Sequence, residues 1–331
     1  MRGLKQLVVP DRVVFVAPGG GAAPAWARAA ERNLFAGSFA GERLALGTVG
    51  EAPASAVLSG VDALPVGGRP FLALVALPQP DPAGLIERLH ARGCRGALLV
   101  GAGIGPLALG AEARLALQAR ARELGGLRVL GPTRVGLILP RLGLNAGATT
   151  FRPLPGELAF VGQSDALTTA MLDWAAARGI GFSLVASLGD GMDVELGDLL
   201  DLLTLDVHTR AILLHIEGVA DARRFMSAAR AAARAKPVIV LRAGRYAGFG
   251  DGTLDPGRLL ERDLAYDAAF ARAGMLRVRS VEELFATAAT LATGIGPRRA
   301  WARQAPSGGR LAVVGNGGGP ALLALDALVA G

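Results

Sequence analysis

The sequence predicts an α/β protein in which parallel sheets are covered by helices. Of the 331 residues, 51% are hydrophobic, only 5% are aromatic and 47 are glycine. Such a composition suits helices packed closely on parallel sheets. Short apolar runs also alternate with helical patterns along most of the chain. This alternation is typical of parallel strands joined by right-handed helical crossovers.

Five apolar runs predict the strands of a first sheet. They are RVVFVAP (12–18), RLALG (43–47), FLALVALP (71–78), GALLVGAG (96–103) and LRVLGP (127–132). Helical patterns such as PAWARAAERNLFAG (24–37) and PAGLIERLHARGC (82–94) separate several of them. The first run leads into PGGGAAP, a glycine-rich turn at the position where doubly wound folds bind a nucleotide.

A second series of strands follows LGLNAGATTFRPLPG (142–156), whose proline and glycine content is typical of a linker. Its apolar runs are ELAFVG (157–162), FSLVAS (182–187), AILLHIE (211–217), PVIVLRAG (237–244) and MLRV (275–278). The last 22 residues, RLAVVGNGGGPALLALDALVAG (310–331), suggest a strand, a glycine turn and a helix. A single βα unit cannot bury its own face. We therefore expect domains at 1–150 and 156–292, with 310–331 either starting a third domain or docking on the others.

The charge pattern argues against nucleic-acid binding. The formal net charge is +7, and nearly all the positive charge is arginine, since Lys5 and Lys236 are the only lysines. The arginines are scattered through helical stretches and do not form a basic run with interleaved aromatics. We expect solvated helix faces and no nucleic-acid partner, although anionic small molecules remain plausible ligands.

Cysteine content and hydropathy predict a cytoplasmic protein. Cys94 is the only cysteine, which excludes an internal disulfide and a cysteine-based metal cluster, and no metal is expected. Asp11 and Arg12 interrupt the apolar run near the start before it reaches the length of a signal sequence. No apolar stretch is long enough to cross a bilayer, so no membrane partner is expected.

Long segments of the second half resemble one known family. LDWAAARGIGFS, LGDGMDVELGDLLDLLTLDVHTRAILLHIEGVADARRFMSAARAAARAKPVIVLRAGR and LAYDAAFARAGMLRVRSVEELF are similar to the second domain of the NDP-forming acyl-CoA synthetases, relatives of the succinyl-CoA ligase α subunit. The similarity extends from Gly156 to Leu291. The resemblance implies a Rossmann-like CoA-binding domain followed by a flavodoxin-like, succinyl-CoA synthetase-like domain.

The resemblance also implies ligands and partners. CoA or acyl-CoA is the expected small molecule, and a fused or separate ATP-grasp domain is the expected protein partner. A close branch of the family carries a fused domain that acetylates lysines of other proteins, so an acetyltransferase domain is a second candidate partner. A homo-oligomer is compatible with the same resemblance.

The family's phosphorylated histidine has no counterpart here. In the family it lies in a segment resembling S-H-T-G-A-L-A-G-S-D, and counting back from YDAAF places this position on Asp255, next to Pro256. An aspartate can in principle form an acyl phosphate, but proline removes a backbone N–H, so we expect a lost phosphoryl site. Glu217 in HIEG matches the family glutamate that faces the histidine and is expected to be inherited structure.

The turn FVGQSDALTT (160–169) indicates the same loss. The family sequence resembles S-Q-S-G-A-L, whereas this chain has GQSDAL, so the former phosphate site comprises Gln163, Ser164 and Asp165. At about 4 Å and an effective dielectric near 20, a fixed carboxylate would oppose each phosphate charge by roughly a few kcal/mol. Alternatively, Asp165 caps its own helix. Either role leaves the site unfit for phosphate.

The histidines do not restore this chemistry. His90 is expected in a helix and His208 in a loop. His215 lies in an apolar strand, where a hydrogen-bonded core histidine is more plausible than a catalyst.

Two segments are candidates for CoA binding. They contribute Pro18, Gly19, Gly20 and Gly21 from the first turn and Gly131, Pro132 and Thr133 from GPTRVG, which corresponds to a family segment resembling G-P-N-C-L-G. Arg28, Arg134 and Arg141 are candidate partners for the phosphates, which favour guanidinium. A purely structural glycine turn is the alternative. NAD is a poor alternative ligand, because the spacing is not G-x-G-x-x-G.

We therefore expect a degenerate synthetase module without ligase activity of its own. It would bind CoA or acyl-CoA as a regulatory part of a protein acetyltransferase. Two alternatives stay open: an active α-type subunit of an ADP-forming acyl-CoA ligase, and a ligand-free interaction scaffold.

Overall fold

The structure, a computed structural model, describes residues 2–19, 23–65, 69–101, 109–189, 191–243 and 256–293. All of them belong to one compact unit formed by residues 1–293. Residues 294–331, and with them the predicted third domain at 310–331, lie outside the described residues.

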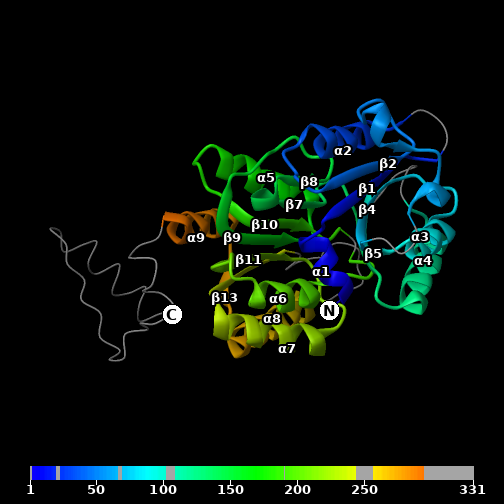
Figure 1. Cartoon of the computed structure of the whole chain (residues 1–331). Helices are drawn as coiled ribbons and strands as arrows, with labels where there is room; N and C mark the ends of the chain where they lie inside the picture. Colours follow the sequence, from blue (N-terminus) through cyan, green and yellow to red (C-terminus); the bar gives the residue numbers. More distant parts are fainter. Residues whose placement is uncertain are drawn as a thin grey trace, which may run out of the picture. The chain divides into compact units, whose positions relative to one another are not determined.

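The first sheet has six parallel strands. They are β1 (Arg12–Val16), β2 (Glu42–Leu46), β3 (Val57–Leu58), β4 (Phe71–Ala76), β5 (Cys94–Val100) and β6 (Arg128–Thr133). Their order is β3-β2-β1-β4-β5-β6, and the winding direction therefore reverses between β1 and β4 (Figure 1). This is the doubly wound order of Rossmann-like folds, as predicted.

The second sheet combines a parallel and an antiparallel part. Its parallel strands are β9 (Pro155–Gly162), β10 (Phe182–Ser187), β11 (Ala211–Ile216), β12 (Val238–Arg242) and β13 (Leu276–Val278). They lie in the order β13-β12-β11-β9-β10, which is the flavodoxin-like order. Two short antiparallel strands, β7 (Leu137–Leu139) and β8 (Leu144–Ala146), extend this sheet beyond β10.

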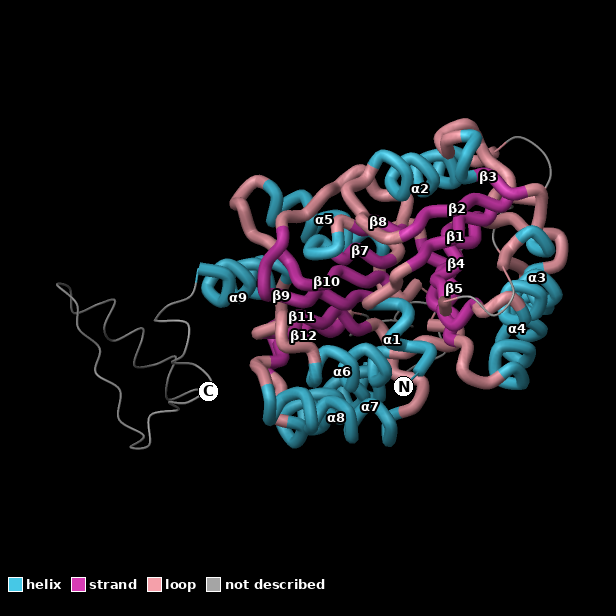
Figure 2. The backbone as a smooth tube through the Cα atoms, in the orientation of Figure 1, coloured by secondary structure: helices cyan, strands magenta, loops and turns pink. Residues whose placement is uncertain are grey.

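Helices cover both sheets (Figure 2). They are α1 (Arg2–Val8), α2 (Ala25–Ala36), α3 (Pro82–Ala91), α4 (Ala111–Leu124), α5 (Asp165–Ala176), α6 (Leu196–Leu205), α7 (Ala222–Ala235), α8 (Pro256–Ala273) and α9 (Val281–Thr293). Short 3₁₀ turns occur at Ala54–Ala56, Val61–Ala63 and Pro140–Leu142. Helices α3 and α4 pack on one face of the first sheet, and α5 and α9 pack on one face of the second.

The two sheets share one apolar core. Phe15 and Leu72 of the first sheet belong to the same buried cluster as Leu184 and Leu214 of the second, and α6, α7 and α8 contribute to it. Successive strand residues point to opposite faces. The fully buried strands are therefore mostly apolar, which explains why apolar runs marked them in the sequence.

The chain changes sheets earlier than its linker-like composition suggests. Strands β7 and β8 belong to the second sheet, although both precede residue 150 and β8 lies within the expected linker 142–156. The predicted domain limits, 1–150 and 156–292, therefore do not coincide with the change from one sheet to the other. Whether they delimit folding units stays a prediction. The start of the chain, where no element was predicted, forms α1 at Arg2–Val8, and its Leu7 is fully buried.

Candidate functional site

The first sheet reverses its winding between β1 and β4, and the segments after these strands are bonded together. The Gly19 N–H donates to Pro78 O (3.0 Å), and Gln79 Nε2 donates to the carbonyls of Ala17 and Ala76 (both 2.8 Å). Doubly wound sheets bind ligands outside the carboxyl ends of their strands at such a reversal. The start of the glycine-rich turn thus lies at an edge suited to a nucleotide-like ligand.

Two of the predicted glycines have a packing reason. A Cβ on Gly19 would lie 2.4 Å from Pro80 Cδ, and a Cβ on Gly131 would lie 2.7 Å from Leu99 O. Gly131 also has a φ of +97°, which only glycine adopts readily. Both glycines are therefore explained without a ligand. Gly20 and Gly21 lie outside the described residues.

The structure brings the two predicted CoA segments together. The Arg134 guanidinium carbon lies 5.2 Å from the centroid of the Trp26 ring, a cation–π arrangement between 131–136 and the first turn of α2. Trp26 Nε1 in turn donates to Leu77 O (3.2 Å). Arg28 lies nearby, but its Nη1 donates to Ala23 O (2.6 Å) and so supports the turn itself.

Arg141 is not brought to this edge. It lies in the 3₁₀ turn after β7 and lines a cavity of about 640 Å³ with Pro10 and Arg12. These residues mark the amino end of β1, whereas Pro18 and Gly19 follow its carboxyl end. Arg134 is therefore the candidate arginine that the fold supports.

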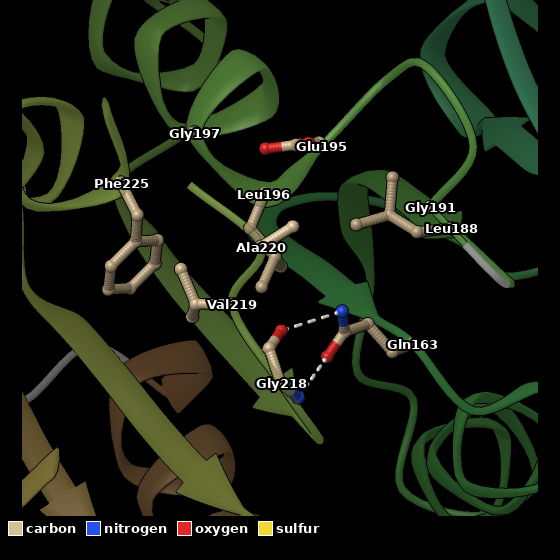
Figure 3. A pocket seen from close by; sticks show the side chains of 10 residues that line it. All are labelled: Gln163, Leu188, Gly191, Glu195, Leu196, Gly197, Gly218, Val219, Ala220 and Phe225. Carbon is tan, nitrogen blue, oxygen red and sulfur yellow. Dashed lines mark hydrogen bonds between the residues drawn. The ribbon is translucent and has the colours of Figure 1, made fainter. Parts of the chain in front are cut away.

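The second sheet reverses its winding between β9 and β11, and Gln163 spans that point. Its Oε1 accepts the N–H groups of Glu217 (2.6 Å) and Gly218 (3.1 Å), while its Nε2 donates to Gly218 O (2.9 Å). Figure 3 shows the amide turned toward Gly218 on the wall of a cavity of about 350 Å³. All the polar atoms of this side chain are thus used within the chain.

The start of α5 is capped by serine. Ser164 Oγ accepts the Leu167 N–H (3.3 Å). The Asp165 carboxylate points elsewhere: its Oδ1 accepts the Thr133 hydroxyl (2.6 Å) and its Oδ2 accepts the Arg134 N–H (2.8 Å). The expectation that Asp165 caps its own helix is therefore wrong, because its side chain is bound to the other predicted segment.

Buried polar groups flank Gly162 at the same edge. Ser187 of β10, Gly162 of β9 and His215 of β11 lie side by side in register. Ser187 Oγ and His215 Nδ1 are buried and have no hydrogen-bond partner within the described part of the chain. His215 is thus a core residue as predicted, but its Nδ1 is not hydrogen-bonded. Burial lowers the pKa of His215 to about 4, so the ring is neutral at neutral pH.

Two further predicted positions have different outcomes. Glu217 is exposed at the carboxyl edge of β11, and its backbone N–H is bound by Gln163. Asp255 lies outside the described residues, so its assignment to the family histidine position stays a prediction.

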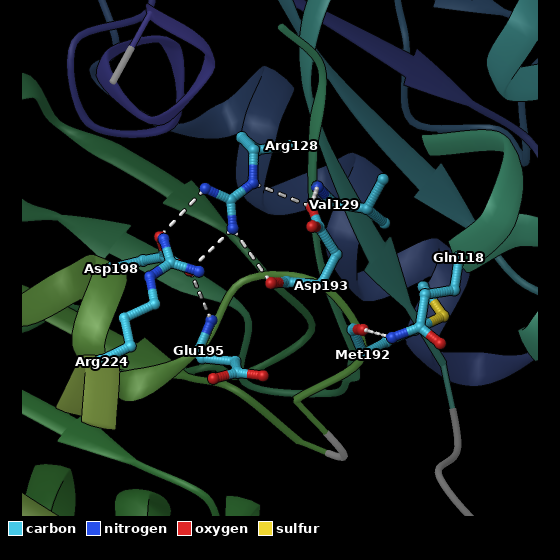
Figure 4. Close-up of polar contacts among 8 residues, drawn as sticks. All are labelled: Gln118, Arg128, Val129, Met192, Asp193, Glu195, Asp198 and Arg224. Atoms are coloured by element: carbon cyan, nitrogen blue, oxygen red, sulfur yellow. Dashed lines mark hydrogen bonds and ion pairs between the residues drawn. The ribbon is translucent and has the colours of Figure 1, made fainter. Parts of the chain in front are cut away.

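A cluster of ion pairs that the sequence did not suggest joins β6 of the first sheet to α6 and α7 (Figure 4). Arg128, the first residue of β6, binds Asp193 (Nε to Oδ2, 3.0 Å) and Asp198 (Nη2 to Oδ2, 2.7 Å), and Arg224 binds the same Asp198. Burial by itself would raise the pKa of Asp198, but hydrogen bonds from Arg128 and the Glu195 N–H outweigh it and lower that pKa. The partners are 65 and 70 residues apart, which is why spacing did not reveal them.

The described ranges contain neither a metal-binding cluster nor a membrane-spanning helix. No group of three His, Cys, Asp or Glu side chains in these ranges is arranged to hold a metal ion. No helix among the same residues has the length and apolarity needed to cross a membrane.

Comparison with known proteins identifies relatives for most of the chain. Residues 155–291 match the succinyl-CoA ligase-like flavodoxin domain. The chain is 34% identical over 258 residues (77% of its length) to acetate–CoA ligase (ADP-forming) I from Archaeoglobus fulgidus. It is 34% identical over 261 residues (77% of its length) to subunit alpha of acetate–CoA ligase (ADP-forming) I from Pyrococcus furiosus. It spans 36% and 54% of these two relatives, respectively.

A solved structure agrees with these matches. The dinucleotide-forming acetyl-coenzyme A synthetase 1 of Ca. Korarchaeum cryptofilum, determined in complex with phosphate and ADP, has a TM-score of 0.73 at 26% identity. The alignment covers 88% of this chain and 63% of that one.

One Rossmann-like and one flavodoxin-like sheet define a protein of the succinyl-CoA ligase α type. The relatives make the assignment more specific: the chain belongs to the family of NDP-forming acyl-CoA synthetases. The resemblance found in the sequence is thereby confirmed.

Proposed function

We propose that the chain is a CoA- or acyl-CoA-binding module of this family that transfers no phosphoryl group and regulates a larger protein, such as a lysine acetyltransferase. One observation carries the proposal. The polar side chains at the start of α5, Gln163, Ser164 and Asp165, are all hydrogen-bonded within the chain. They leave little side-chain capacity for a phosphate, and the Asp165 carboxylate would repel one.

The neighbouring predicted CoA segments support retained CoA binding. Arg134 stacks on Trp26 next to the glycine-rich turn, and its guanidinium has no carboxylate partner among the residues described. A guanidinium in this place suits a pyrophosphate or a 3'-phosphate. The names of the acetate–CoA ligase relatives point to the same ligand class.

Calorimetric titration of the 331-residue chain with CoA and acetyl-CoA tests this proposal. We expect Arg134→Ala to weaken binding by about tenfold, the effect of removing one charge-assisted contact. Arg178→Ala is the matched control, because Arg178 also stacks on a tryptophan, Trp174, at 4.6 Å. If neither CoA nor acetyl-CoA gave a heat of binding, CoA binding would be contradicted and the ligand-free scaffold would be favoured.

An active α-type ligase subunit is the second candidate. It is favoured by the exposed Glu217 beside Gln163 and by the ligase activity named for the relatives. Incubation with labelled ATP and an ATP-grasp partner subunit separates the two functions. We expect no covalent label. Labelling that is lost in Glu217→Gln and Asp255→Asn would overturn the non-phosphorylated proposal.

A further inference from the structure

The contact between Asp165 and the segment 133–135 has the geometry of a bound oxyanion. Its carboxylate accepts the Thr133 hydroxyl (2.6 Å), the Arg134 N–H (2.8 Å) and the Val135 N–H (3.4 Å). Successive backbone N–H groups that converge on one point form an anion-binding concavity. Here the anion is supplied by the chain itself.

The donors are arranged for this occupant. Thr133 is 1% exposed, and its oxygen accepts the Gly136 N–H (3.1 Å), which leaves the hydroxyl proton directed at Asp165. The Arg134 side chain lies over Trp26, so the backbone N–H and not the guanidinium makes the contact. Ser164 caps α5 without help from Asp165. Ser164, and not the Asp165 carboxylate, therefore supplies the side-chain cap of α5.

We propose that residues 133–135 form an oxyanion site that Asp165 keeps occupied, so that a small carboxylate or orthophosphate enters only when this side chain is removed or displaced. Asp165 is then an autoinhibitory residue that also ties α5 to the end of β6. The donors belong to a predicted CoA segment, but the test uses acetate and orthophosphate and not CoA, so its outcome is separate from that of the CoA titration.

Chemical rescue of thermal stability tests the site on the full chain. Asp165→Ala removes the carboxylate, and acetate or, in a second arm, orthophosphate is added against sodium chloride at equal ionic strength. We expect either oxyanion to raise the Tm of Asp165→Ala with an apparent affinity at least about tenfold tighter than for the unmodified chain. Comparison of the two arms shows which oxyanion the site prefers.

Matched variants locate the effect. Asp173→Ala removes an exposed carboxylate from the same helix and should give no acetate response. Thr133→Val combined with Asp165→Ala removes one of the three donors, the buried hydroxyl, and should weaken the response. If neither oxyanion shifts the Tm of Asp165→Ala beyond the shift of Asp173→Ala, the proposal is overturned.

A folding failure of Asp165→Ala is also informative. If Asp165→Ala does not fold, we expect acetate, but not chloride, to restore its folding during dilution from urea. Asp165→Asn provides a second variant, since it keeps the shape of the side chain without its charge. Because its side chain still fills the site, Asp165→Asn should show no Tm response to either oxyanion. Failure of acetate to restore folding of Asp165→Ala would count against the site.

Discussion

Arg128 and Asp198 form a bidentate ion pair, with Nη1 3.0 Å from Oδ1 and Nη2 2.7 Å from Oδ2. The pair joins β6 of the first sheet to α6 beside the second. The Asp198 side chain is fully buried, and the Arg128 side chain is 18% exposed. A carboxylate in such a place requires a partner, because the cost of its lost hydration is otherwise uncompensated.

Arg128→Met should therefore destabilise the fold by about 3 kcal/mol, since it leaves Asp198 with Arg224 as its remaining ion-pair partner in the described region. Urea unfolding measures the change. Arg120→Met is the control, because its pairs with Glu87 and Glu123 are exposed and should contribute less than about 1 kcal/mol. Equal losses of unfolding free energy in Arg128→Met and Arg120→Met would contradict a structural role for the ion-pair cluster.

Gly189 should be needed for the approach of its loop to the candidate CoA segment. It has a φ of +55°, and a Cβ there would lie 2.0 Å from Pro132 O. Gly179 has a φ of +63° but no atom within 4 Å of its Cβ position. Both alanine variants incur the left-handed backbone cost of about 1–2 kcal/mol. Gly189→Ala should cost at least about 2 kcal/mol more in chemical unfolding. Similar losses would show that the close approach is unimportant.

His215 should make stability depend on pH. Its pKa in the folded chain is about 4, below the ordinary value of 6.5, so the unfolded chain binds more protons between these values. The stabilisation from keeping the ring neutral is complete above pH 6.5 and is lost as the pH falls toward 4. Its full extent is about 3 kcal/mol.

Unfolding free energies measured across this pH range should show a flatter profile in His215→Leu. His208→Leu, which changes an exposed histidine, should leave the profile unchanged. A pH profile that is identical in the original chain and in His215→Leu would show that protonation of this ring does not oppose folding.

Cys94 should be unreactive in the folded protein. The thiol is fully buried, and burial raises its pKa to about 12. Only the thiolate attacks alkylating reagents, so iodoacetamide at neutral pH should modify the thiol only after unfolding. Mass spectrometry with and without denaturant checks this. Rapid modification of the native chain would mean that β5 opens readily.

Local patterns predicted most of the regular structure. The apolar run at 71–78 contains β4, and the run at 182–187 is β10, because strands buried on both faces are mostly apolar. Helix α1 escaped prediction, since a seven-residue helix has little stability alone and depends on burying Leu7. Strands β7 and β8 have three residues each; β8 lies within the predicted linker, and no element was predicted at β7.

The candidate site was predictable in position but not in its contacts. Strand-to-helix turns at 16–20 and 160–165 indicated the carboxyl edges of both sheets. The partners of Asp165 lie about thirty residues earlier, and no spacing rule connects them. Sequence reasoning therefore recognised an unusual carboxylate that would oppose phosphate, with capping of its own helix as the alternative, but did not find its partners.

The sequence by itself determined most of the succession of strands and helices, the family and the places where glycine-rich turns meet the sheets. Only the tertiary structure decided that Asp165 binds residues 133–135, that Gln163 bonds to Gly218 and that Arg128 pairs with Asp198. The physical reason is one of range. Hydropathy and turn residues report the burial and backbone geometry of neighbours in the chain, whereas these polar contacts depend on how separate strands and helices pack together.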